Sequence, residues 1–325
     1  MVRALRPLHD RSHATLTILA YHRVMPIDAL EAYPFDDQLI SATPAQFDWQ
    51  MRYLREHLNP VALSDLIAYL DEGAPLPPAA VAVTFDDGFA DTYRYAFPVL
   101  KRYAIPATVF VSTGYVDSRE PFWFELAAYL VYRLDPHALC VPGGPSFPAG
   151  DSREARTRSL RQLHGILKDL PNAERLALIT DWTHRFADRI AHDAAGHSQP
   201  ISWLQVQEMA GSGIEFGSHT VTHPNLTCIS NQDLETELRT SKQTLEDKLQ
   251  RAVASIAYPI GTPSTFNTDV IEAIERHGYK LGLTYLAGAN ALQMIDRFRL
   301  NRHGVGLCMT LPYFRAVTSL PYWLH

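Results

Sequence analysis

Two adjacent carboxylates and two histidines four residues apart are the side chains of this sequence whose spacing could support chemistry. Asp86 and Asp87 follow the apolar run Val81–Phe85 and are followed at once by Gly88. Such a run is typical of a buried strand. Two ionised carboxylates at its end repel each other and lose solvation, so a solvated Asp-Gly turn or a bound cation must offset that cost.

Two histidines lie at the end of a later predicted strand, where they could bind a metal ion. His219 ends the apolar segment 214–220, and His223 follows just before Pro224. Among 14 histidines such a pair is by itself weak evidence, because most histidines are surface or satisfied core groups. Two histidines with one carboxylate nevertheless make an open three-ligand set for a divalent ion, and zinc, cobalt, nickel and iron all fit it. The remaining carboxylate would then be free to act as a base on a metal-activated water.

The elements that must position these residues alternate between strands and helices. Helices are expected at 43–58, 63–73 and four later amphipathic segments. This alternation predicts an α/β fold with a largely parallel sheet, whose carboxyl edge carries the chemistry. The predicted strands are 15–21, 80–86, 107–113, 214–220, 254–259, 280–285 and 297–303.

One region interrupts the alternation. Residues 116–200 contain no convincing strand but two polar helical stretches, 151–170 and 172–193. We expect a mostly helical insertion on a single catalytic domain that spans residues 1–325. Phe122, Trp123 and Phe124 have the spacing of core residues of the insertion, with sugar stacking as the alternative.

Composition limits the classes of partner. A net charge of −6 over 325 residues argues against nucleic acid, which needs a basic face. Three widely spaced cysteines and no recognisable leader favour a cytoplasmic protein, with peripheral membrane association left open. No apolar run is long enough for a transmembrane segment, and no feature indicates an oligomeric state.

The motifs TFDDGF (84–89) and SHTVTHP (218–224) together resemble the polysaccharide deacetylases, the superfamily of chitin, peptidoglycan and poly-N-acetylglucosamine deacetylases. The resemblance implies a distorted, incomplete (β/α)7 barrel with the helical insertion. It further implies that Asp86 is the general base and that Asp87, His219 and His223 bind one divalent metal ion, with zinc expected first.

A third motif is only partly matched. The stretch AYPIG, 257–261, places Ala257 where the family has arginine and Ile260 where it has an aromatic residue. The resemblance assigns the oxyanion hole to the backbone N–H of Ile260, which survives the side-chain change. Tyr258 and Pro259 beside it are the candidate substrate-binding residues. Arg302 or Arg23 could replace the missing arginine that orients Asp86.

The general acid has two candidates. His22 follows the first predicted strand, 15–21. This placement resembles that in the deacetylases of poly-N-acetylglucosamine, in which the acid histidine belongs to the first strand. His303 ends the last predicted strand and fits the family pattern poorly. We favour His22, since a histidine near neutral pH suits protonation of a leaving amine.

The expected function is metal-dependent removal of an N-acetyl group from an amino sugar in a glycan or glycan intermediate. A carbohydrate is therefore the expected substrate. Two alternatives stay open: an amidase or formamidase for small molecules, and a degenerate, non-catalytic carbohydrate-binding protein. The four intact residues Asp86, Asp87, His219 and His223 argue against the last, because unpaired buried carboxylates are costly to keep.

Overall fold

A curled, mainly parallel sheet lies at the centre of the protein. The structure is a computed structural model that describes residues 15–27, 30–118, 120–134, 139, 141, 152–193 and 198–319. All neighbouring strands of the main path run parallel except β10, which pairs antiparallel with β1. In sheet order this path is β10 (Asn290–Ala291), β1 (Thr15–Tyr21), β5 (Ala80–Phe85), β6 (Ala107–Val111), β7 (Glu215–Ser218), β8 (Ser255–Ala257) and β9 (Leu281–Leu283).

Six of the predicted strands are thus confirmed, and the seventh is wrong. Segment 297–303 is mostly turn and irregular chain, although its alternation of polar and apolar residues mimics a strand. It crosses from one edge of the sheet to the other: Leu300 forms an isolated bridge with Leu283, and β11 (His303–Gly304) then pairs with β1. No stretch of it stays beside one partner long enough to form a full strand. The fold is an incomplete (β/α) barrel.

Short strands and helical turns complete the body around the sheet. A small parallel sheet joins β2 (Arg23–Val24) to β3 (Ile40–Ala42), and β4 (Asn59–Pro60) pairs with β5. The short helical turns span Leu30–Ala32, Asp37–Leu39, Leu292–Met294 and, as a π-helix, Thr92–Ala96.

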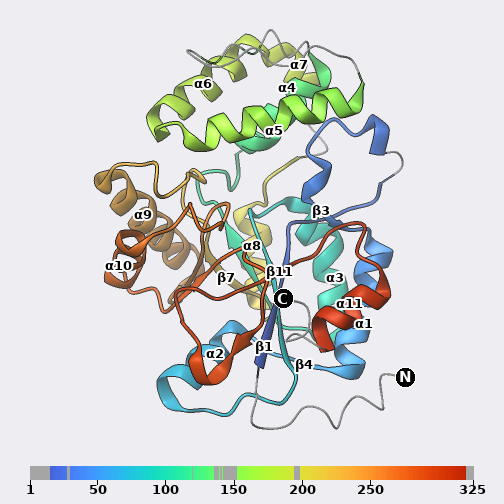
Figure 1. The fold of residues 1–325 in the computed structure, drawn as a ribbon, viewed down its shortest axis with the longest axis vertical. Helices are drawn as coiled ribbons and strands as arrows, with labels where there is room; N and C mark the ends of the chain where they lie inside the picture. Colours follow the sequence, from blue (N-terminus) through green and yellow to red (C-terminus); the bar gives the residue numbers. More distant parts are fainter. Residues whose placement is uncertain are drawn as a thin grey trace.

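Helices flank the sheet on both sides (Figure 1), as strand–helix alternation requires. Two start and stop signals of the sequence are confirmed: Thr43 and Gln46 form a capping box at α1, and Gly73 ends α2 with φ +73°. The helices of the body are α1 (Pro44–His57), α2 (Leu63–Glu72), α3 (Phe97–Tyr103), α8 (Trp203–Gly211), α9 (Asn231–Leu249), α10 (Thr268–Arg276) and α11 (Leu311–Ser319).

The expected insertion is helical in the part that the structure describes. Its helices α4 (Trp123–Arg133), α5 (Arg153–Asp169), α6 (Asn172–Arg185) and α7 (Ala187–Asp193) form a layer of their own at one end of the body (Figure 1). The link 142–150 and Cys140 lie outside the described residues. An apolar cluster joins α4, α5 and Trp182 to Phe35 and Phe89 of the body, so buried apolar surface fixes this layer against the barrel.

None of the described helices combines the length and the apolar character that crossing a membrane requires.

Candidate metal centre and active site

The candidate residues follow the carboxyl ends of neighbouring parallel strands. Asp86 and Asp87 follow β5, and His219 follows β7, with β6 between them. The backbone hydrogen bonds of the sheet continue into these residues: Asp86 N donates to Tyr21 O over 2.9 Å, and His219 N donates to Val111 O over 3.0 Å. The chain therefore brings the predicted carboxylates and the histidine to one edge of the sheet.

Asp87, His219 and His223 form a compact three-residue cluster. One ligand atom of each lies within 4.8 Å of the others, and all three residues are buried, with exposed fractions of 3%, 2% and 7%. Asp87 Oδ1 lies 3.5 Å from His219 Nε2 and 3.4 Å from His223 Nε2. These separations exceed those of good N–H···O hydrogen bonds, which are about 2.9 Å.

The same separations match the spacing of metal ligands. Ligand atoms 2.0–2.2 Å from a tetrahedral zinc ion lie about 3.4 Å from one another. His219 Nδ1 lies 2.8 Å from Ala257 O, so donation to that carbonyl would leave Nε2 with its lone pair free for an ion. Asp87 Oδ2 is buried and has no hydrogen-bond partner among the described residues. The donor set therefore fits a divalent cation and leaves a coordination position open.

The backbone at the site is held in unusual conformations. Asp87, Thr220 and His223 all have φ in the left-handed region, at +70°, +67° and +54°. Non-glycine residues adopt it only where the surroundings impose it, and such residues cluster at functional sites. Gly88 has φ +88°, and a Cβ there would lie 2.8 Å from the Val111 side chain. The glycine after the aspartate pair is therefore required by space as well as by φ.

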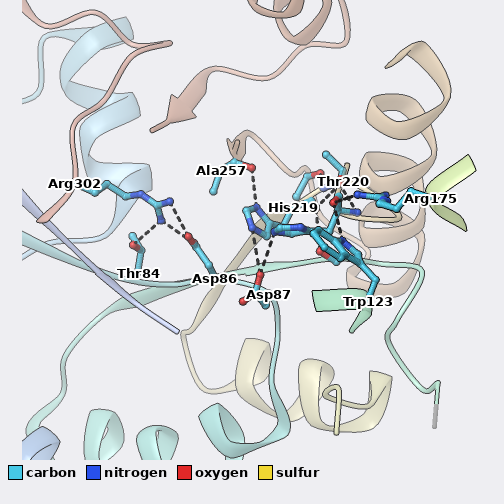
Figure 2. Close-up of polar contacts among 12 residues, drawn as sticks. Thr84, Asp86, Asp87, Trp123, Arg175, His219, Thr220, Ala257 and Arg302 are labelled. Carbon is cyan, nitrogen blue, oxygen red and sulfur yellow. Dashed lines mark hydrogen bonds and ion pairs between the residues drawn. The ribbon is translucent and has the colours of Figure 1, made fainter. Parts of the chain in front are cut away.

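Asp86 is paired with Arg302. The guanidinium donates from Nη1 to Oδ1 and from Nη2 to Oδ2, both over 2.7 Å, and both side chains are buried (Figure 2). Burial alone would raise the pKa of Asp86, but the charge and hydrogen bonds of Arg302 outweigh it and lower that pKa to about 2. Of the two arginines that the sequence offered for orienting Asp86, Arg302 is therefore the one that contacts it. Arg23 instead pairs with Asp91.

The carboxylates also act on the two histidines. Burial alone would lower the pKa of His219, but the contact with Asp87 and the charges of Asp86 and Asp87 raise it above its ordinary value. Burial and the charge of His219 hold the pKa of His223 well below its usual range. The carboxylates therefore favour a positive charge on His219, whereas burial disfavours one on His223.

The two candidate acids occupy different places. His22 follows β1 and lines the same pocket as Asp86, and its ring centre lies 5.4 Å from that of Tyr285. His303 is buried in β11 against β1 and is not among the residues that line the pocket. The geometry favours His22 as the group that can reach a substrate.

The motif 257–261 contributes unequally to the pocket. Ile260 lines it with φ +67°, and Tyr258 lines it while its hydroxyl donates to Phe298 O over 2.8 Å. That bond engages the Tyr258 hydroxyl, and its ring stacks on Phe266 with ring centres 4.7 Å apart, so its role in substrate binding stays a prediction. Pro259 is buried and does not line the pocket, and its role in substrate binding stays a prediction.

The pocket encloses about 240 Å³, slightly less than the ~300–1,000 Å³ typical of sites that bury a drug-sized ligand. Trp123 and Phe124 line it although they also belong to the core of the insertion. Sequence reasoning missed further lining residues, because they come from distant elements and carry no local signal. These are Asp36, Gln38, Leu39, His164, Lys168 and Tyr285.

Comparison with known proteins agrees with this fold. The Bacillus subtilis protein YxkH is 22% identical over 277 residues, which cover 85% of this chain and 66% of that protein. The poly-β-1,6-N-acetyl-D-glucosamine N-deacetylase of Staphylococcus aureus is 32% identical over 105 residues, which cover 30% of this chain and 36% of that protein. The chain thus spans from about a third to about two thirds of the length of these relatives.

Solved structures share the architecture. The deacetylase PplD of Streptococcus pyogenes, in complex with acetate, superposes with a TM-score of 0.60 at 22% identity, over 93% of this chain and 96% of that one. IcaB of Ammonifex degensii gives a TM-score of 0.57 at 21% identity, over 94% and 96%. The family model described as polysaccharide deacetylase matches residues 73–282, more than half of the chain. This chain therefore belongs to the polysaccharide deacetylase family.

Proposed function

We propose that this protein is a metal-dependent hydrolase that removes the N-acetyl group from an amino sugar in a glycan or glycan intermediate. One observation carries the proposal: three candidate metal ligands and a buried, arginine-paired carboxylate line a single pocket. Asp87, His219 and His223 supply the cluster, and Asp86, held by Arg302, supplies the carboxylate.

The substrate class rests on the pocket and on a relative. The S. aureus relative is named for deacetylation of poly-β-1,6-N-acetyl-D-glucosamine, and its match supports an N-acetylated amino sugar here. A volume of about 240 Å³ accommodates one sugar ring, so the rest of a polymer would lie outside the pocket. Phe124 lines the pocket and offers an aromatic side chain to that ring, whereas Trp123 and Tyr258 are buried, at exposed fractions of 0% and 1%.

Asp87, His219 and His223 would hold the cation through Oδ1 and the two Nε2 atoms. A divalent ion bound there supplies a Lewis acid that polarises the acetamide carbonyl and makes water acidic enough to attack near neutral pH. Asp86 accepts the proton of the attacking water. Because Arg302 keeps the pKa of Asp86 at about 2, this carboxylate is in its proton-accepting form throughout the physiological range.

The remaining groups act on the carbonyl oxygen and the leaving nitrogen. We assign the oxyanion donor to the backbone N–H of Ile260, because Ile260 lines the pocket and its φ of +67° marks a tight bend there. His22 gives a proton to the nitrogen as the C–N bond breaks. One water is consumed, and acetate and the free amine of the sugar are released.

The test separates the metal from the base. We expect Asp86→Asn to lose acetate release from N-acetylglucosamine oligomers by at least ~10²-fold while its metal content stays that of the wild type. We expect His219→Ala to lose both. His277→Ala is the matched control, because His277 pairs with Glu235 on α9 and touches no ligand. Full activity in Asp86→Asn would refute the assignment of the base.

A further inference from the structure

The carbonyl oxygen of His223 accepts hydrogen bonds from two side chains of the helical insertion. Arg175 Nη1, on α6, donates over 2.8 Å, and Trp123 Nε1, on α4, donates over 3.1 Å. Both side chains are fully buried, with exposed fractions of 1% and 0%. The Arg175 guanidinium also lies over the Trp123 ring, 4.9 Å from its centre. In Figure 2 these two residues lie on the other side of His219 from Arg302.

The loop that carries His223 is held from two directions. Arg175 Nη2 donates to Thr222 O over 3.0 Å. From the body, Glu237 of α9 accepts hydrogen bonds from the backbone N–H groups of Val221 and Thr222, over 2.6 and 3.0 Å. The loop between the two histidine ligands is therefore fixed between α6 of the insertion and α9 of the barrel.

This fixation acts on a backbone that would otherwise relax. His223 has φ +54°, a conformation that costs free energy in a non-glycine residue and persists only where neighbouring contacts impose it. Two donors on one carbonyl oxygen set the orientation of the peptide plane after His223. The backbone that carries the imidazole is thereby held in place, and the imidazole Nε2 lies 3.4 Å from Asp87 Oδ1.

We propose that Arg175 and Trp123 are positioning residues of the metal centre, so that the helical insertion is a working part of the metal site. The inference rests on the proposed function, because it takes Asp87, His219 and His223 as the ligands. Neither residue touches the ion or the reacting atoms. Partners of metal ligands commonly change metal affinity by 10–100-fold when removed, and we expect an effect of that size here.

The experiment compares two arginines of the insertion. Arg156 on α5 is the matched control: its Nη1 donates to the backbone carbonyls of Val131 and Leu134, over 2.7 and 2.6 Å, far along the chain from any ligand. The full chain and its variants are stripped of metal, checked for folding by circular dichroism, and titrated with zinc against a chromophoric chelator.

We expect Arg175→Met to weaken zinc binding by about 10–100-fold and Trp123→Phe, which keeps the ring but loses the donor, by a smaller factor. Arg175→Lys should recover part of the loss, and Arg156→Met should stay within about twofold of the wild type. If Arg175 had a purely structural role, Arg175→Met and Arg156→Met would both lose thermal stability, and the zinc affinity of the folded molecules would be unchanged.

The outcomes separate this inference from the proposed function. Wild-type affinity in folded Arg175→Met and Trp123→Phe would overturn it, and so would equal weakening in Arg156→Met. If Arg175→Met does not fold, Trp123→Phe decides. If the wild type binds zinc and the variants lose affinity as expected, but the wild type releases no acetate, the proposed function is contradicted and the positioning role stands. A wild type that binds no zinc would overturn both.

Discussion

Replacement of Arg302 by methionine should expose how much the protein depends on one buried ion pair. Arg302 and Asp86 form two hydrogen bonds of 2.7 Å, and both side chains are buried. Methionine fills much of the same space without charge or donors. The substitution therefore leaves the Asp86 carboxylate buried and without its partner.

The structure gives a scale for the loss. The pKa of Asp86 is lowered from 3.8 to about 2 although burial acts in the opposite direction. That difference corresponds to about 2 kcal/mol, at roughly 1.4 kcal/mol per pKa unit. Removal of one partner from a buried pair also strands the other charge, which typically costs about 3–5 kcal/mol. We expect the free energy of unfolding of Arg302→Met at pH 7 to fall by about 3–5 kcal/mol.

The pH dependence has a definite sign. In the wild type, the folded-state pKa of Asp86 lies below the unfolded value, so its stabilisation is present above about pH 4 and is lost as the pH falls toward 2. Without the charge and hydrogen bonds of Arg302, this pKa rises. The deficit of Arg302→Met should therefore be largest at neutral pH and shrink toward pH 4.

Urea unfolding at several pH values measures this deficit. Arg299→Met is the control, because Arg299 forms a 2.7 Å ion pair with Asp296 in the same segment, at exposed fractions of 50% and 45%. We expect that variant to lose less than about 1 kcal/mol. Adding Asp86→Asn to Arg302→Met should restore part of the stability. A deficit below about 1 kcal/mol, or one that does not change with pH, would refute the reasoning.

Two further predictions concern the acid and a second buried carboxyl group. His22→Gln should lower the rate of acetate release by about 10²–10⁴-fold with metal content unchanged, whereas His303→Gln should retain most of it per folded molecule; the reverse order in the acetate assay would reassign the acid. Burial raises the pKa of Glu125 to about 8 despite the nearby charge of Arg23. This folded-state pKa exceeds the ordinary value of 4.5 that holds in the unfolded chain. The free energy of unfolding of the wild type should therefore fall by up to about 5 kcal/mol as the pH rises from about 5 to 8. In urea unfolding, Glu125→Gln should show a smaller fall over the same range. Parallel curves for the two proteins would contradict it.

The metal cluster was predictable because its signals are local. The pair Asp86–Asp87 and the pair His219 and His223 each follow an apolar strand, and parallel strands place their carboxyl ends at one edge. Arg302 was predictable only as one of two candidates, because no local pattern says which arginine faces Asp86.

Other features depend on tertiary contacts that the sequence does not encode locally. Arg175 and Glu237 are polar residues on amphipathic helices, where the pattern indicates solvent-facing positions, yet both are buried against the histidine loop. The segment 297–303 has the alternation of a strand, but it changes partner from β9 to β1 and does not form one. In each case packing between distant elements overrides the local preference.

The most direct test of the central claim is a joint measurement of bound metal and acetate release on the purified wild-type protein. We predict about one divalent ion per chain, acetate release from N-acetylglucosamine oligomers, loss of that release with a chelator, and recovery on addition of zinc or cobalt. Acetate release that a chelator leaves unchanged after the metal has been removed would contradict the account. A protein that neither binds metal nor releases acetate after zinc or cobalt is added would contradict it as well.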